Sequence, residues 1–418
     1  MRKEFYTMRL RKHSGHKLLS ILLILVLILV STGCGNQQTT GGGGDSKDIK
    51  IGVLLPLTGA LAKIGENNKN GYELAVKEIN EKGGIKALGG AKLKLVYGDS
   101  QGKPDVGVSE TERLIQNEKV VLVTGAFQSN VTIPTTQVAE RLQTVYLNPV
   151  AIADSITNRG FKYTFQINAK ASWFARDQVN FLDYVAKVTN KKPQKVALLY
   201  ENTDFGQSTA AGQKKYLAEK GYDIVADVSY PAGAADLTTE LSKIKVANPD
   251  VVLQVSYIAD AILIAKTKDR LGIKVPFVDS AGGSADPAFI QSVKELANGW
   301  FTINQFNKDL PGSKELNDKF KAAYGTDMNG HAALDYQAMF VLKEVLEKQA
   351  SVDKEAIRKG LSEIQMGAGP SLIMPYEKLS FDSTGQASSS LIITQIQNGE
   401  HVTVWPEKFA TVKPNFYN

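Results

Sequence analysis

The chain has 418 residues, of which 43% are hydrophobic and 22% charged, with a formal net charge of +6 and one cysteine. Residues 1–33 hold six basic residues and one acidic residue, so the remainder has a net charge of +1. A nearly neutral body argues against nucleic-acid binding, and one cysteine excludes an internal disulfide. After residue 33 the only histidines are His331 and His401, so we expect no metal site and no cofactor.

The N-terminus combines basic residues with a short apolar run. Residues 18–30, LLSILLILVLILV, are uncharged and would form a helix of about 20 Å, shorter than the ~30 Å core of a membrane. We therefore expect residues 1–33 to be a secretory signal peptide. A permanent N-terminal anchor helix is the alternative.

The residues around the cysteine indicate where the protein is held. Ser31-Thr32-Gly33-Cys34 resembles the lipobox of bacterial lipoproteins, although Ser31 stands where leucine is usual. The resemblance implies a lipid on Cys34, and the glycine-rich residues 34–47 would be a flexible tether. We expect the protein to be exported and lipid-anchored on the outer face of the cytoplasmic membrane, or periplasmic.

After the tether, short apolar runs alternate with amphipathic stretches. Residues 49–57 are apolar nearly throughout, as a buried parallel strand requires. In residues 70–84, apolar residues recur at helical spacing as far as a Gly-Gly pair. The pattern then predicts strands over 92–99, 120–126 and 144–149, and helices over 104–118 and up to about residue 142.

A second series of the same kind begins near residue 169. It predicts helices over 172–188, 206–219, 236–246 and 259–271, and strands over 195–201, 222–231, 250–256 and 276–280. An apolar run over 299–306, three helical stretches between 313 and 363, and a hairpin over 391–405 with an Asn398-Gly399 turn follow. Two series of βα units predict an α/β protein with two lobes, each built on a doubly wound parallel sheet.

Catalytic signatures are absent from the sequence. It has no G-x-G-x-x-G after a strand, no phosphate-binding G-x-x-x-x-G-K-[ST] and no G-x-S-x-G nucleophile elbow. We therefore expect a binding protein and not an enzyme. An exported hydrolase would need a nucleophile with a base nearby, and no spacing in the sequence supplies the pair.

The strand-to-helix turns are where specificity should lie, because ligands of open α/β sheets bind beyond the carboxyl ends of the strands. These turns are residues 57–65, 125–132, 148–155, 201–206, 256–260 and 279–283. They offer two aromatic residues, Phe205 and Tyr257, and a hydroxyl at a helix start, Ser129. Such a serine is commonly only an N-cap, but the free N–H groups of a helix start also attract a carboxylate.

Residues 51–85, IGVLLPLTGALAKIGENNKNGYELAVKEINEKGGI, resemble the start of the branched-chain amino-acid-binding proteins of ABC importers. The resemblance continues in order through GAFQSNVT, RGFKYTFQINA, ENTDFGQ and LSFDSTGQ. It implies a type I periplasmic-binding-protein fold with a three-segment hinge. The expected lobes are residues 48–169 plus 305–375 and residues 170–304 plus 376–418. Such a monomer would pass a captured solute to an ABC permease and its ATPase subunits.

The resemblance also implies ligand-binding residues. Ser129, beside Gln128, would hold the ligand carboxylate, and Phe205 and Tyr257 would cover the ligand from the second lobe. The remaining family positions match Ile64 in the side-chain pocket, Val150 or Ala151 at a backbone contact, and His331 on a late helix. A solvated surface histidine is the alternative for His331.

Two positions depart from the amino-acid binders. Ile152 stands where they have a threonine near the α-amino group, and Ala281 where they have the glutamate that pairs with that ammonium. A buried ammonium without a partner costs at least ~1–3 kcal/mol, which is tenfold to hundredfold in affinity. We hypothesise a small, partly apolar or aromatic carboxylate or amide without an α-ammonium. In the alternative, Asp279 or Asp154 pairs with the ammonium of a branched-chain amino acid.

The same fold also serves solute sensors that present a bound ligand to a receptor or kinase. No feature of the sequence separates a sensor from an importer component.

Overall fold

The computed structural model describes residues 48–280, 282–367 and 378–417. Residues 46–418 form one compact unit. The predicted signal peptide, the tether with Cys34, and Ala281 lie outside the described residues. Among those that are described, no helix has both the length and the apolar character needed to cross a membrane.

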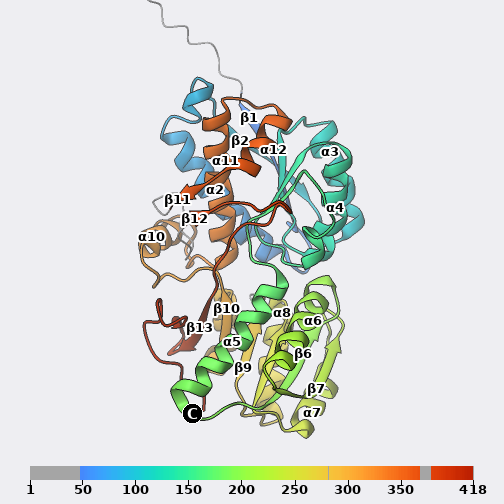
Figure 1. The fold of residues 1–418 in the computed structure, drawn as a ribbon, viewed down its shortest axis with the longest axis vertical. Coiled ribbons are helices and arrows are strands. Elements are labelled where there is room, and N and C mark those ends of the chain that lie inside the picture. The colour runs from blue at the N-terminus through green and yellow to red at the C-terminus, as the bar shows by residue number, and fades with distance from the viewer. Residues whose placement is uncertain (1–47, 281, 368–377, 418) are drawn as a thin grey trace, which may run out of the picture. The chain divides into compact units, whose positions relative to one another are not determined.

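The first sheet has five parallel strands in the order β2-β1-β3-β4-β5 (Figure 1). Ile51 in β1 pairs with Leu95 on one side and Leu122 on the other, and β1 is buried along nearly its whole length because helices cover both faces. The strands are β1 (Ile49–Leu55), β2 (Leu93–Asp99), β3 (Leu122–Gly125), β4 (Val145–Asn148) and β5 (Thr164–Gln166). The helices around it are α2 (Ala62–Glu81), α3 (Pro104–Gln116), α4 (Ser129–Arg141), α10 (Ser313–Tyr324), α11 (Gly330–Gln349) and α12 (Lys354–Glu363).

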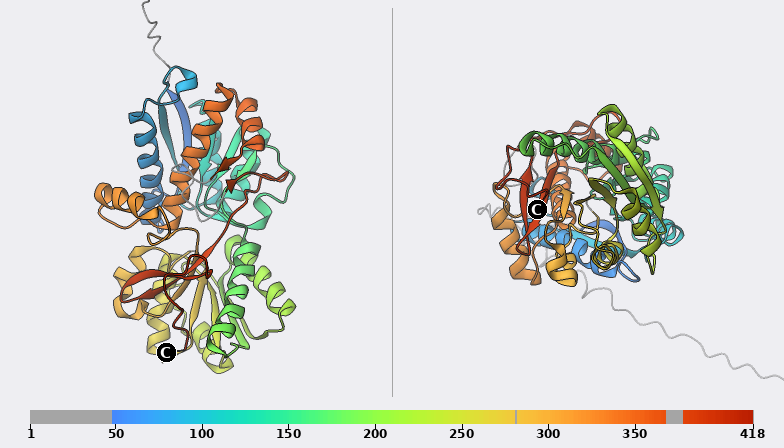
Figure 2. Two further views of the ribbon diagram at one scale, coloured as in Figure 1. Left: turned by 60° about the vertical axis from the view of Figure 1, so that its left-hand side comes forward. Right: turned by 90° about the horizontal axis from the view of Figure 1, so that it is seen from below.

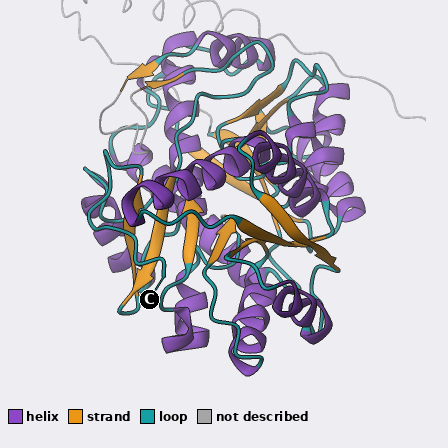
Figure 3. Ribbon diagram, turned by 60° about the horizontal axis from the view of Figure 1, so that its bottom comes forward, coloured by secondary structure: helices purple, strands orange, loops and turns teal. Residues whose placement is uncertain are grey.

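The second sheet has seven strands in the order β14-β13-β10-β9-β8-β6-β7, in which β13 runs antiparallel to both of its neighbours, β10 and β14. Figure 3 shows the strands in orange with the helices, in purple, around them. Its strands are β6 (Lys195–Glu201), β7 (Asp223–Tyr230), β8 (Val251–Val255), β9 (Phe277–Ser280), β10 (Phe301–Asn304), β13 (Ile392–Gln397) and β14 (Glu400–Trp405). Its helices are α5 (Ala171–Thr189), α6 (Asp204–Glu219), α7 (Thr238–Ala247), α8 (Ile258–Arg270) and α9 (Pro287–Val293). The predicted α/β class with parallel sheets is confirmed.

The shorter elements complete the fold. Strands β11 (Met366–Gly367) and β12 (Lys378–Leu379) form a separate antiparallel pair. Single 3₁₀ turns cover Lys86–Leu88, Asp154–Ile156 and Lys294–Ala297. The turn between β13 and β14 has Asn398 at φ 52° and Gly399 at φ 78°, the left-handed pair that a tight hairpin requires.

One helix begins earlier than its apolar spacing indicates. Helix α2 starts at Ala62, before the periodic stretch that begins near residue 70. The added turns contain Gly65, where a Cβ atom would meet the Pro56 carbonyl oxygen at 2.1 Å. Glycine and asparagine weaken a helical pattern, but here the absence of a side chain lets α2 approach the end of β1.

The chain passes between the two sheets three times, at residues 167–170, 305–312 and 387–391. Figure 2 follows the last passage, in red, toward hairpin β13–β14. Gln386 still pairs with Gln166 of β5, so we propose that the second lobe resumes after this pairing and not directly after residue 375.

Three buried amide side chains are joined by hydrogen bonds, two within the first two passages and the third, Gln386, directly before the last passage. Gln305 Nε2 donates to Asn168 Oδ1 at 2.8 Å, and Gln386 Nε2 donates to the Asn168 carbonyl oxygen at 2.7 Å. Asn168 Nδ2 in turn donates to the Val150 carbonyl oxygen at 2.7 Å. This network ties the hinge to the turn after β4.

Candidate ligand site

A small cavity lies where the carboxyl-end turns of both sheets meet. It has about 30 Å³ of free volume, room for roughly two waters at ~10–15 Å³ each, so a larger solute fits only if the cavity widens. Ten described residues line it: Phe127, Ser129, Val150, Ala151, Ile152, Asn168, Phe205, Tyr257, Gly282 and His331. Seven of the predicted site residues are therefore brought together, from segments as far apart as β3 and α11.

Ser129 begins α4 but is not its N-cap, which is Gln128 without a side-chain cap bond. The Ser129 Oγ accepts hydrogen bonds from the backbone N–H groups of Ile152 at 3.3 Å and Ala153 at 3.2 Å. Because both lone pairs of the hydroxyl face these donors, its own hydrogen is left to donate elsewhere. The first N–H groups of α4 lie at the same end of the helix, so this wall of the cavity can supply donors to an anionic or carbonyl oxygen.

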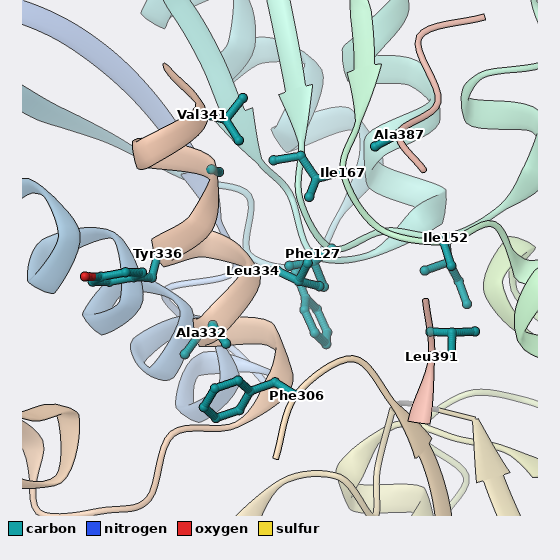
Figure 4. Close-up of a cluster of buried hydrophobic side chains, with 14 of the residues drawn as sticks. Phe127, Ile152, Ile167, Phe306, Ala332, Leu334, Tyr336, Val341, Ala387 and Leu391 are labelled. Atoms are coloured by element: carbon teal, nitrogen blue, oxygen red, sulfur yellow. The ribbon is translucent and has the colours of Figure 1, made fainter. Parts of the chain in front are cut away.

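A strained turn after β3 carries an aromatic ring into the cavity wall. Gly125, Ala126 and Phe127 have φ values of 109°, 63° and 68°, and non-glycine residues in this region cost about 1–2 kcal/mol each. The Phe127 ring lies 5.2 Å from that of His331 and 6.0 Å from that of Tyr257. Figure 4 shows Phe127 within the buried apolar cluster that also contains Leu334 and Ile152.

The second sheet contributes two more rings. Phe205 lies in the first turn of α6 and Tyr257 is the N-cap of α8. Their ring centroids are 5.4 Å apart, and both side chains are nearly fully buried. Together with Phe127 they form a continuous aromatic wall that crosses from one lobe to the other, suited to a flat or branched apolar body.

Neither candidate acid lines the cavity. Asp279 accepts hydrogen bonds from the Ser256 hydroxyl at 3.2 Å, from the Ser280 N–H at 3.1 Å, and from the N–H and hydroxyl of Ser284 at 2.8 Å each. Burial raises the pKa of Asp279 to about 6 although these bonds oppose it. Asp154 Oδ1 accepts from the Ser172 N–H at the start of α5. Among the described lining residues, none carries a carboxylate.

Three further predicted residues lie elsewhere or cannot be placed. Ile64 is buried in the core on α2, and the Gln128 side chain faces the Gly102 carbonyl oxygen at 3.5 Å, so neither lines the cavity. Ala281 lies outside the described residues. Because alanine has no ionisable group, this position supplies no counter-charge wherever it lies.

Three of the lining residues are not among those predicted from the sequence: Phe127, Asn168 and Gly282. Phe127 could have been found, because it is an aromatic residue within the turn already identified after β3. Gly282 is required sterically, since a Cβ atom there would meet the Ser256 carbonyl oxygen at 1.9 Å. Asn168 carried no local signal, because its importance comes from partners in the other hinge passages.

Metal binding finds no support in the described part of the chain, where no three His, Cys, Asp or Glu side chains are clustered to hold an ion. His401 is half-buried beside Thr394, and desolvation lowers its pKa to about 4.

Comparison with known proteins agrees with this architecture. Residues 48–400 match the family model described as Periplasmic binding protein, and the chain belongs to this family. A curated relative, Leu/Ile/Val-binding protein homolog 7 of Brucella suis biovar 1, is 33% identical over 87% of this chain and 93% of its own length. With this relative and the fold, the chain is a type I periplasmic binding protein of the branched-chain amino-acid-binding group, as the resemblance predicted.

Two solved structures illustrate the fold. The branched-chain amino acid substrate-binding protein LivJ from Streptococcus pneumoniae, in complex with isoleucine, has a TM-score of 0.74 and 26% identity, covering 85% of this chain and 99% of that one. A solute-binding protein of an ABC transporter from Rhodopseudomonas palustris BisB5, in complex with 3,4-dihydroxybenzoic acid, has a TM-score of 0.74 and 20% identity, covering 85% and 95%. These similar proteins are solute-binding proteins and not enzymes.

Proposed function

We propose that the protein is the exported, lipid-anchored substrate-binding component of an ABC importer, and that it captures a small carboxylate or amide without an α-ammonium. The observation that carries the proposal is the composition of the cavity wall. Ser129 offers a donor from the first lobe and three aromatic rings offer apolar surface, while no described lining residue offers a carboxylate. The described part of the cavity wall therefore supplies no counter-charge for the ammonium of an amino acid.

Burying the ammonium of an amino acid in this cavity would cost free energy. A charged group buried without a partner costs at least ~1–3 kcal/mol, and closure of this cleft would remove water from both ends of the ligand. Asp279 is committed to the turn that follows β9, so using it would break bonds that hold this turn. A ligand with only an acceptor end avoids this cost and still uses Ser129.

The similar proteins supply precedent for two ligand classes. The Rhodopseudomonas palustris protein was crystallised with 3,4-dihydroxybenzoic acid, which is an aromatic carboxylate without an amine. The isoleucine complex of LivJ and the name of the Brucella relative favour a second candidate, a branched-chain amino acid. The two candidates differ in the α-ammonium group, so comparing the binding of an amino acid with that of its amine-free analogue separates them.

Capture would proceed without chemistry. The open form exposes the cleft, the ligand contacts both lobes, and closure follows because only the closed form makes both sets of contacts. The permease would bind the closed lobes and the lipid on Cys34 would keep the domain near it. The protein would act as a monomer.

The direct test is a thermal-shift screen of residues 46–418, refolded to remove carried-over ligand. Each amino acid is paired with its amine-free analogue, such as leucine with 4-methylpentanoate and phenylalanine with 3-phenylpropanoate, and benzoate is added. A compound that binds only the native state raises the melting temperature. We expect the amine-free member of a pair to give the larger shift; larger shifts with leucine, isoleucine or valine would establish the second candidate.

Ser129→Ala tests the donor side of the cavity. Because the variant loses the hydroxyl hydrogen and leaves the Ile152 and Ala153 N–H groups without their acceptor, we expect binding of the best compound to weaken by roughly tenfold to a hundredfold, equivalent to about 1.4–3 kcal/mol. Ser109→Ala, an exposed serine on α3, is the matched control. Equal affinity of the two variants would remove Ser129 from the site.

Transport and sensing are separated by deletion in the source organism. Loss of uptake of the identified solute would support the importer role. Unchanged uptake with altered gene expression would support the sensor alternative.

A further inference from the structure

Outside the cavity, a buried polar contact joins the two lobes. The Asp286 Oδ2 accepts hydrogen bonds from Asn67 Nδ2 at 3.1 Å and from Asn329 Nδ2 at 2.8 Å. Asp286 precedes α9 of the second lobe, whereas Asn67 lies on α2 and Asn329 precedes α11 in the first lobe. The three side chains are 2%, 6% and 5% exposed, so the contact exists only while the lobes are together.

The two capping residues are already fixed by their own helices. Asp286 Oδ1 accepts from the Ala288 N–H at 2.8 Å and is the N-cap of α9. Asn329 Oδ1 accepts from the Ala332 N–H at 2.8 Å and is the N-cap of α11. Little side-chain entropy is lost when they meet, and each retains one unused group, an acceptor on Asp286 and a donor on Asn329, aimed at the other lobe.

The contact lies beside the ligand site. His331, which lines the cavity, is two residues after Asn329, and Gly282, which also lines it, is four residues before Asp286. A ligand that brings these walls together therefore also brings the three polar side chains together.

We propose that Asp286, Asn67 and Asn329 form a latch that stabilises the closed form and sets ligand affinity without touching the ligand. The proposal rests on the proposed function insofar as capture occurs by closure. A carboxylate is suited to the role because it accepts from both amides at once. The carboxylate also disfavours partial closure, because burying its charge is unfavourable unless both amide donors are in place.

The test is a reciprocal exchange of the two groups across the contact. Asn67→Asp places two carboxylates against each other in the closed form, and we expect ligand binding to weaken at least ~10-fold because like charges meet. The double variant Asn67→Asp with Asp286→Asn restores the acceptor–donor pair between positions 67 and 286 and keeps a good N-cap for α9. It leaves Asn329 Nδ2 facing the new amide nitrogen, so it should recover part of the affinity. Asn70→Asp, the same change on α2 outside the latch, should have no effect.

Closure itself is measured by double electron–electron resonance spectroscopy, which gives the distance between two spin labels. A chain that begins at Ser46 has no cysteine, so Gln116→Cys on α3 and Val246→Cys on α7 give one spin label on each lobe. Distances are recorded without ligand, with leucine and with 3-phenylpropanoate. We expect Asn67→Asp to reduce the closed population under the condition that closes the wild type, and the double variant to restore part of it.

The outcomes are distinct. An unchanged closed population and affinity in Asn67→Asp, or no recovery in a folded double variant, would overturn the latch. Closure of the wild type by leucine alone would overturn the amine-free ligand while leaving the latch testable with leucine. A single distance under every condition would overturn closure and the latch together.

Discussion

At the scale of single residues, the turns after β3 and β9 use polar groups for opposite purposes. In the first, Ser129 accepts two backbone hydrogen bonds and keeps its own hydrogen for the cavity. In the second, both carboxylate oxygens of Asp279 are occupied by four hydrogen bonds from the protein, so Asp279 does not pair with a ligand. The ligand chemistry we propose follows from this difference.

The buried Asp279 predicts a pH dependence of stability. Because burial raises its pKa from 3.8 to about 6, the native state binds this proton more tightly than the unfolded state does. The resulting stabilisation is complete below the unfolded pKa and is lost as the pH rises through about 6. We therefore expect the free energy of unfolding of the wild type to fall by about 2 kcal/mol, through this group, as the pH rises from about 4.5 to about 7.

The comparison with Asp279→Asn isolates this effect. The variant loses hydrogen bonds at every pH, but its side chain does not titrate. Because only the wild type loses stability as the pH rises, the variant should be destabilised relative to the wild type by less at neutral pH than in mild acid, as measured by urea unfolding. The same destabilisation at both would mean that the pKa of Asp279 is not raised.

At the scale of elements, helices α2 and α11 position Asn67 and Asn329, the first-lobe side of the latch, and cross closely. A Cβ atom on Gly71 would meet the Ala332 carbonyl oxygen at 2.3 Å. The two helices can therefore pack backbone against backbone only with glycine at this position.

Gly71→Ala places two effects in competition. Alanine favours the helix by about 1 kcal/mol, but overpacking costs about 1–3 kcal/mol, and a contact with a fixed backbone oxygen lies at the upper end of that range. We expect a net loss of about 1–2 kcal/mol in urea unfolding, whereas Lys77→Ala, an exposed site on α2, should change stability by less than about 0.5 kcal/mol. A stabilised Gly71→Ala would show that the crossing has room to adjust.

At the scale of the whole described molecule, the hinge is held by amides from three passages far apart in sequence. Asn168 accepts from Gln305 and Gln386 and also lines the cavity. Asn168 therefore links the cavity wall to the hinge directly.

Gln305→Ala tests this network without entering the cavity. Gln305 is fully buried, and its loss removes one of the donors to Asn168 Oδ1, so we expect a destabilisation of about 1–3 kcal/mol. Calorimetry should also show a broader transition if the lobes begin to unfold separately. Gln207→Ala, an exposed glutamine on α6, is the control, and equal melting of the two variants would contradict a structural role for the network.

The sequence by itself determined the two series of βα units, the Asn398-Gly399 hairpin and the turns that form the cavity, because periodicity and turn chemistry depend on residues close together along the chain. Only the tertiary structure decided that Phe127 joins the cavity wall, that Asp279 is committed to its own turn, and that Asp286 meets Asn67 and Asn329. These contacts join residues that local patterns cannot relate, because each partner is chosen by the packing of a different helix or sheet. For the same reason, the ligand class that we propose depends on the tertiary structure, which places Asp279 and Asp154 outside the cavity lining.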